Sequence, residues 1–275
     1  MLGCFYAAVS LGLSISFGLL DVPHIAHPAF LVLGAFATYM LGGYGIDPLL
    51  AGLLMAPPFF VFGLLVYQFY YLVFERRGTD LGLRGLAFFF GVAFIVEVSL
   101  ILAFGVDQRM VEAPYIGTSV SILGTRMPTR MLVAFGVALA LAAILSVYLS
   151  KTFTGRAIKA VAQDEGALRL MGANPVRIKR WAFGIATATC AIAGSLLIIV
   201  APVEPSLDRL YISRTFCVVV LAGLGSMSGT LVAGLILGIA ESIVLTSAGT
   251  SWAPAVSFGI LLLVLGVRPA GLFGR

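Results

Sequence analysis

The sequence predicts an all-α integral membrane protein that crosses the bilayer many times. Hydrophobic residues fill 60% of its 275 positions and charged residues only 11%, which leaves too little polar surface to cover a soluble globule. The apolar stretches are continuous and lack the ten-residue alternation that marks the strands of a membrane barrel. Because a helix satisfies its backbone hydrogen bonds within one segment, we expect spanning helices.

The apolar segments predict about eight or nine spans, two of them short. A helix needs roughly 20 mostly apolar residues to cross the hydrocarbon, and the candidate segments are 1–20, 29–45, 49–74, 86–106, 131–150, 181–201, 212–224, 230–247 and 254–267. The first segment lacks a basic start and a small-residue cleavage site, so we expect it to remain as a span. Cys4, Cys190 and Cys217 lie in or beside these segments without metal-site spacing, which favours buried small side chains.

The one long polar stretch, residues 151–180, indicates the orientation of the chain. It holds seven of the seventeen basic residues, and basic loops between spans lie on the cytoplasmic side. Propagating this orientation places the 75–84 loop and the 268–275 tail on the same side, and the stretches 107–130 and 202–209 outside. The formal charge of +5 follows from this topology and does not indicate nucleic acid, because the basic residues lie at the ends of apolar segments.

Two runs of turn-forming residues interrupt the apolar pattern within the predicted membrane region. They are 21–28 and 223–229, and each is expected to join an inward-running helix to an outward-running one. The helices that follow, FLVLGAFATYM and LVAGLILGIAES, look alike, which suggests an internal parallel repeat of the kind that transporters use. Candidate residues of a solute pathway or gate in these breaks are His24, His27, Gly225 and Gly229.

Simpler roles compete with a pathway role for these residues. His24 and His27 are three apart, but no carboxylate or cysteine near them in sequence completes a metal site. We therefore expect a lining contact or a structural hydrogen bond, and no bound metal. The glycines of the second break have the GxxxG spacing of closely packed helices, as do Gly234 and Gly238, and packing is their expected role.

Glu97 and Glu241 are predicted to lie within spans. An unpaired charge at that depth costs on the order of several kcal/mol, so both carboxylates are expected to face the bundle interior or a cavity. Two roles stay open: part of the solute pathway or its gate, or a protonated or hydrogen-bonded glutamate that locks two helices together. No basic partner is visible in the sequence, so proton-coupled chemistry is not expected.

Within the polar stretch, the local sequence predicts a short helix followed by a turn and a second helix. Residues 163–165 open the first helix, and Gly172 suits its end because glycine accepts the left-handed conformation found there. Asn174 and Pro175 suit the cap and the first turn of the next helix. We expect this segment to be exposed on the cytoplasmic side.

Ala167, Leu168 and Met171 are expected to share one face of the short helix, which gives the exposed segment a small apolar surface. A soluble partner protein would bury such a surface. The alternative is an amphipathic segment that lies on the anionic headgroups of the membrane lipid, which basic residues beside an apolar face also favour.

The same segment resembles the cytoplasmic coupling loop of ATP-binding-cassette (ABC) importer permeases, in which a short helix followed by glycine docks on an ATPase subunit. Glu165, Ala167, Leu168 and Gly172 match that pattern. More narrowly, the stretches GRAIKAVAQD, LMGANPVRIK, LAGLGSMSGTLVAGLILGIAES and VRPAGLFGR look like the LivH-type permeases of branched-chain amino acid ABC transporters. The opening YAAVSLGLSISFGLLDVPHIAHPAF is similar to the same family, so the resemblance covers nearly the whole chain.

The resemblance implies a single permease domain over residues 1–275, with 151–180 as its coupling loop, in the bacterial inner membrane. It implies that branched-chain or related hydrophobic amino acids are the solute and that the chain is not an enzyme. The implied partners are a second, LivM-like permease, two cytoplasmic ABC ATPases and an extracytoplasmic solute-binding protein. In agreement, the sequence contains no GxxxxGK followed by Ser or Thr, so ATP would be bound by the partners and no cofactor by this chain.

Three other readings compete with this one. A stand-alone secondary transporter or channel would use the broken helices and Glu97 as an ion site, but it leaves the basic stretch unexplained. A membrane enzyme would have to use Asp21, His24 and His27. A related ABC permease would carry urea or short-chain amides, and the proline at position 28, where the family usually has glycine, leaves the solute open because proline fixes φ and removes an N–H.

Overall fold

The computed structural model describes residues 1–20, 22–77, 81–122, 125–247, 249–268 and 270–274. Eleven α-helices make up most of this part: α1 Leu2–Ser16, α2 His27–Gly42, α3 Pro48–Val73, α4 Leu81–Phe104, α5 Thr129–Lys151, α6 Phe153–Gln163, α7 Glu165–Leu170, α8 Pro175–Val200, α9 Asp208–Ala222, α10 Met227–Ser247 and α11 Ala253–Val267. Single 3-10 turns are η1 Glu75–Arg77, η2 Pro205–Leu207 and η3 Thr250–Trp252. One antiparallel hairpin pairs β1 Ser119–Ile122 with β2 Thr125–Pro128.

The predicted all-α, multi-pass fold is confirmed. Each of the nine apolar segments corresponds to one helix, and α6 and α7 occupy the polar stretch between them. Five helices (α3, α4, α5, α8 and α10) are long and apolar enough to cross a membrane, and α1, α2 and α11 are shorter apolar helices. The hairpin was not predicted; it lies within the stretch 107–130, which the sequence placed only as an external connection.

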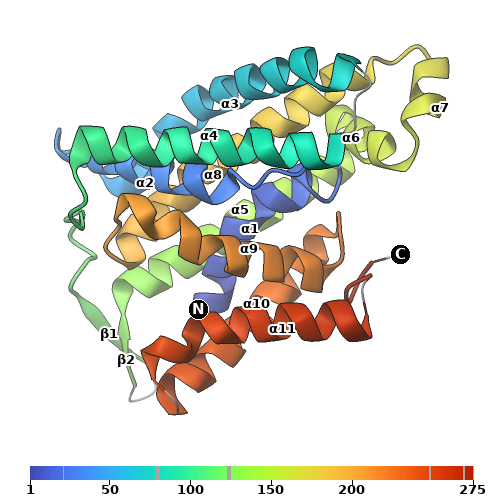
Figure 1. Cartoon of the computed structure of the whole chain (residues 1–275). Helices are drawn as coiled ribbons and strands as arrows, with labels where there is room; N and C mark the ends of the chain where they lie inside the picture. Colours follow the sequence, from blue (N-terminus) through green and yellow to red (C-terminus); the bar gives the residue numbers. More distant parts are fainter. Residues whose placement is uncertain (21, 78–80, 123–124, 248, 269, 275) are drawn as a thin grey trace.

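Helix α8 is the centre of the bundle, with α1, α2 and α3 packed around it (Figure 1). Of its most apolar 18-residue window, 83% is buried, against 39% or less for the other long helices. Small residues make this close contact possible: Gly34 of α2 lies against the backbone of Cys190, and Gly194 lies against the backbone of Leu31 and Ala35. Lipid is as apolar as leucine, so membrane helices associate through such close packing rather than through hydrophobic burial.

Glycines also join α1 to α10. A Cβ on Gly238 would meet the backbone of Gly3, and one on Gly234 would meet the backbone of Gly3 and Ala7. The packing role predicted for Gly234 and Gly238 is therefore confirmed. The two helices run antiparallel, with Thr230 Oγ1 donating a hydrogen bond to Ser14 Oγ at 3.1 Å near their other ends.

The contacts between connections agree with the predicted sidedness. Arg109 and Val203 exchange backbone hydrogen bonds at 2.8 and 2.9 Å, which joins the two stretches expected outside. At the opposite end Lys179 binds Glu75, so the polar stretch and the 75–84 loop meet. Figure 1 shows α6, α7 and the C-terminus at one end of the bundle and the β1–β2 hairpin at the other.

Candidate functional site

Helix α7 and its flanking turns form the structure that the polar stretch predicts. The Asp164 side chain caps α7 by accepting a hydrogen bond from Ala167 N at 2.9 Å. Gly172 follows the helix with φ +80°, a conformation that side chains with a Cβ rarely adopt. Asn174 then caps α8 by accepting from Arg177 N at 3.2 Å.

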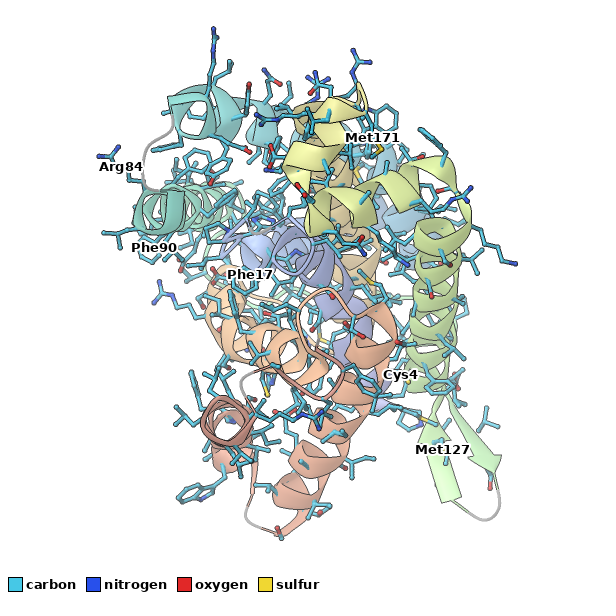
Figure 2. All side chains as sticks on the ribbon, turned by 90° about the vertical axis from the view of Figure 1, so that its right-hand side faces the viewer. Cys4, Phe17, Arg84, Phe90, Met127 and Met171 are labelled. Carbon is cyan, nitrogen blue, oxygen red and sulfur yellow. The ribbon has the colours of Figure 1, made fainter. Side chains whose placement is uncertain are left out.

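The exposed apolar face of α7 differs from the predicted one at a single position. Ala167, Leu170 and Met171 are exposed, the last two by 91% and 75%. Residues three and four apart share a helix face, so these three lie together, whereas Leu168 points into the protein and is only 5% exposed. Leu168 is therefore not part of the exposed face, and Leu170 takes its place. Figure 2 views this end of the molecule and labels Met171, the residue that directly follows α7.

Ion pairs tie α7 to the helical bundle. Glu165, the first residue of α7, lies 2.6 Å from Arg169 and 2.7 Å from Lys179 of α8. Lys179 also lies 2.8 Å from Glu75, which follows α3. Burial alone would raise the pKa of Glu165, but the hydrogen bonds and charges of Lys179 and Arg169 outweigh that effect and lower this pKa. The glutamate is ionised at neutral pH and is held by both cations.

The two membrane glutamates have basic partners, which corrects the reading from sequence. Glu241 of α10 is 1% exposed and accepts two hydrogen bonds from Arg214 of α9, at 2.6 and 3.0 Å. The Arg214 guanidinium also lies over the rings of Tyr6 and Tyr211, at 5.5 and 5.4 Å. A buried carboxylate needs such pairing, because the charged form is otherwise costly at this depth. This geometry fits the helix-locking role that had been left open for Glu241.

Glu97 of α4 is similarly paired, but closer to the surface. Arg209, at the start of α9, donates a hydrogen bond to Glu97 at 2.7 Å. The arginine side chain is 68% exposed and the glutamate 8% exposed. Arg209 ends the stretch 202–209, which the sequence places outside. Its guanidinium neutralises the carboxylate of Glu97, which lies within the predicted span 86–106.

The histidines of the first break lie deep in the bundle, and neither faces an open space. His24 is fully buried, with its ring centroid 4.6 Å from that of Phe183 and 5.0 Å from that of Phe89. His27, the first residue of α2, places Nε2 2.9 Å from Val9 O and Nδ1 3.3 Å from Cys190 Sγ. A structural hydrogen bond, one of the two roles expected for these residues, is therefore present at His27.

No group of three or more metal-ligating side chains occurs among the residues that the structure describes. Cys190 does approach His27 in space, although nothing in the sequence brings the two together. Cys4, Cys190 and Cys217 are all buried, as predicted. Asp21, which the enzyme reading required, lies outside the described residues.

The glycines of the second break shape the turn between α9 and α10. Gly225 has φ +80°, and a Cβ there would meet the backbone of Gly18, which lies between α1 and the first break. Gly229 lies in the first turn of α10, close to the carbonyl of Ala222. The second break therefore contacts the chain just before the first break, which lies about two hundred residues earlier in the sequence. Their roles as a pathway or gate remain predictions.

Sequence reasoning missed the basic residues that complete these sites. Arg214 had a detectable signal, since an arginine within the predicted span 212–224 must find an acidic partner or water. Lys179 was visible only as one of seven basic residues, and its two acidic partners are 104 and 14 positions away. Only folding brings Glu75, Glu165 and Lys179 together.

Fold and site together define a multi-pass membrane protein that exposes the apolar residues of α7 at the end of the bundle away from the β1–β2 hairpin. The family of branched-chain amino acid transport system permease components matches residues 1–265, and the chain belongs to this family. It is thus a transport permease component of the inner membrane and not an enzyme, which confirms the resemblance seen in the sequence.

Curated relatives match over almost the whole chain. The high-affinity branched-chain amino acid transport system permease protein LivH of Escherichia coli is 27% identical over 288 residues, covering 100% of this chain and 92% of that protein. The high-affinity branched-chain amino acid transport system permease protein BraD of Pseudomonas aeruginosa is 26% identical. That match covers 99% of this chain and 92% of BraD. LivM of Salmonella typhimurium is 27% identical over 97% of the chain and 67% of that protein. No solved structure matches the chain significantly.

Proposed function

We propose that the chain is the transmembrane permease subunit of an ATP-driven importer for branched-chain or related hydrophobic amino acids. The observation that carries this proposal is the family match over residues 1–265, together with relatives whose names all describe branched-chain amino acid transport permeases. In this proposal residues 1–275 form one permease domain, and residues 151–180 are its cytoplasmic coupling loop.

The proposal assigns the remaining work to other chains. Similarity to both LivH and LivM supports a pair of related permease subunits that share one pathway. The sequence has no phosphate-binding loop, so two cytoplasmic ATPase subunits supply the ATP-binding sites. An extracytoplasmic binding protein delivers the solute on the side of the β1–β2 hairpin.

Helix α7 is the proposed contact with an ATPase subunit. Leu170 and Met171 are among the most exposed apolar side chains of the chain, at 91% and 75%, and they project from the cytoplasmic end. Exposed apolar surface of this kind favours a protein partner. Glu165, Ala167 and Gly172 shape the segment by pairing, small size and a left-handed turn, and movement of α7 would rock the spans around a central solute site.

The competing functions explain fewer observations. In a stand-alone ion-coupled transporter Glu97 would be the ion site, yet its carboxylate is paired with Arg209. A stand-alone transporter also gives the exposed apolar face of α7 no role. In a membrane enzyme His24 would be catalytic, yet phenylalanine rings enclose it. Binding of labelled leucine, but not labelled urea, to the cognate extracytoplasmic protein would decide between the two solute classes.

The test of the assembly is affinity purification from native membranes in mild detergent. We expect ATP-hydrolysing subunits to co-purify with the chain, and the double variant Leu170→Glu with Met171→Glu to lose them while its spans still insert. Replacing Ala167 or Gly172 by a bulky charged residue should have the same effect. The matched control is Leu83→Glu, which charges a residue that is 76% exposed at the start of α4. Recovery of the wild-type chain without any ATPase would overturn the proposed function.

A further inference from the structure

Lys179, in the second turn of α8, joins two carboxylates that come from distant parts of the chain. Its Nζ lies 2.8 Å from Glu75 Oε1 and 2.7 Å from Glu165 Oε2. The Lys179 and Glu75 side chains are 12% and 14% exposed, and that of Glu165 is 32% exposed. Water and salt screen such shielded pairs less than surface pairs. One ammonium group thus holds α7 to both α8 and the end of α3.

The contacts continue from Glu75 into the bundle. Its second oxygen accepts a hydrogen bond from the Tyr67 hydroxyl of α3 at 2.7 Å, and Tyr67 has no exposed surface. The Tyr67 ring lies 5.7 Å from that of Phe183, which in turn lies 4.6 Å from the ring of His24. An unbroken series of side chains therefore connects α7 at the cytoplasmic surface with the break between α1 and α2.

A cavity of about 120 Å³ lies beside the three charged groups. Its wall includes Leu19, Leu20 and Val22, which belong to the connection between α1 and α2. Protein interiors are otherwise close packed, so most buried side chains cannot change position without moving their neighbours. The cavity gives Glu165, Lys179 and Glu75 room to shift together while Lys179 keeps both of its ion pairs.

We propose that Lys179 is the positioning residue that transmits the movement of α7 to the membrane spans, which rests on the proposed function of α7 as the contact with an ATPase. When the ATPase displaces α7, the Glu165 carboxylate pulls on Lys179 and thereby on α8, and the bond from Lys179 to Glu75 carries the displacement to α3. Energetic coupling of this kind travels through ion-pair networks and packed side chains that have two arrangements. Docking itself uses the exposed face of α7 and does not require Lys179.

The experiment measures the number of solute molecules imported per ATP hydrolysed by the complete complex, in wild type and in Lys179→Met, Lys179→Arg and Glu75→Gln. The methionine variant removes the charge at similar length, and the arginine variant keeps it. Glu75→Gln leaves the pair between Lys179 and Glu165 intact, so it is informative even where Lys179→Met fails to fold. Arg180→Met is the matched control, because Arg180 is the next residue and hydrogen bonds to Gln68 rather than to an acid.

We expect Lys179→Met and Glu75→Gln to retain the ATPase subunits and basal ATP hydrolysis but to lose solute-stimulated hydrolysis and import by about tenfold, within the usual range of coupling between sites. Lys179→Arg should restore most of the solute imported per ATP hydrolysed, and Arg180→Met should resemble wild type. Wild-type stoichiometry in both Lys179→Met and Glu75→Gln would overturn the inference, as would a loss that only parallels loss of the ATPase. Wild-type import that does not depend on ATP would instead contradict the proposed function itself.

Discussion

Arg214 and Glu241 form an ion pair inside the bundle, and their burial makes each partner depend on the other. Two rings, Tyr6 and Tyr211, cover the guanidinium, which leaves little access for water. Removing one partner of a buried pair exposes the other to an apolar environment without compensation, whereas replacing both by apolar residues is often neutral. The pair is therefore more important for the arrangement of α9 and α10 than for the net free energy of folding.

Single substitutions at this pair should be much more damaging than the double substitution. We expect Arg214→Ala or Glu241→Ala to lower the free energy of unfolding by about 3–5 kcal/mol, and Arg214→Met combined with Glu241→Leu to recover most of that loss. Unfolding in mixed micelles measures the four members of the cycle. Glu97→Ala is the comparison, with a smaller loss because Arg209 is mostly exposed. Losses that simply add in the double variant would show that the two residues do not act as a pair.

The sequence was sufficient to predict which acidic residues are unusual, but not what they bind. Glu97 and Glu241 are identifiable because a carboxylate inside an apolar span has few stable environments. Their partners are 112 and 27 positions away, and the choice among several arginines depends on how the helices pack. The same limit applies to His27 and Cys190, which meet only because glycine contacts bring α2 close to α8.

At the scale of elements, glycine decides which helices lie in contact. Gly238→Val would place side-chain atoms against the backbone of Gly3, which cannot move without displacing α1. Overpacking of this kind costs typically about 1–3 kcal/mol, so we expect a lower free energy of unfolding. The matched control is Gly91→Val in α4, where a Cβ meets nothing within 4 Å. Equal stability of the two variants would contradict the close approach of α1 and α10.

The stability that the ion pairs of α7 provide should depend on pH, because it requires an ionised Glu165. Because its pKa is lowered in the folded chain, its pairing with Lys179 and Arg169 stabilises the protein at neutral pH. That contribution is lost as the pH falls below the ordinary range of a glutamate and through the lowered pKa. The difference in thermal midpoint between wild type and Glu165→Gln should therefore be present at pH 7 and vanish in acid. A difference that grew on acidification would have the wrong sign for this ion pair.

Local signals predicted the ends of α7 and α8 well. Asp164 and Asn174 each cap a helix with a side-chain oxygen that accepts from a backbone N–H three residues later, and Gly172 and Pro175 act through their own backbone geometry. None of these effects needs knowledge of the rest of the fold. The orientation of α7 was less accessible, since which of its apolar residues turns inward depends on the packing beneath it. Leu168 and Leu170 are equally hydrophobic in sequence, yet one is buried and the other is exposed. The internal repeat of the α1–α2 and α9–α10 breaks stays a prediction.

For the whole molecule, the basic stretch predicts which side faces the cytoplasm, and the contacts at the two ends agree on which connections share a side. Cysteine labelling on intact cells tests this directly, because the native cysteines are buried and give little background. Val120→Cys in β1 should react with a membrane-impermeant maleimide, and Met171→Cys in α7 only after permeabilisation. The opposite pattern would invert the topology and remove α7 from the cytoplasmic ATPases.

ATP-driven import by the reconstituted complex tests the role of the chain most directly. The complex that co-purifies with this chain would be placed in proteoliposomes with the extracytoplasmic binding protein and labelled leucine on the side of the β1–β2 hairpin. We predict uptake that requires hydrolysable ATP on the α7 side and stops with a non-hydrolysable analogue. Uptake that continues without ATP and follows an ion gradient would contradict the importer role.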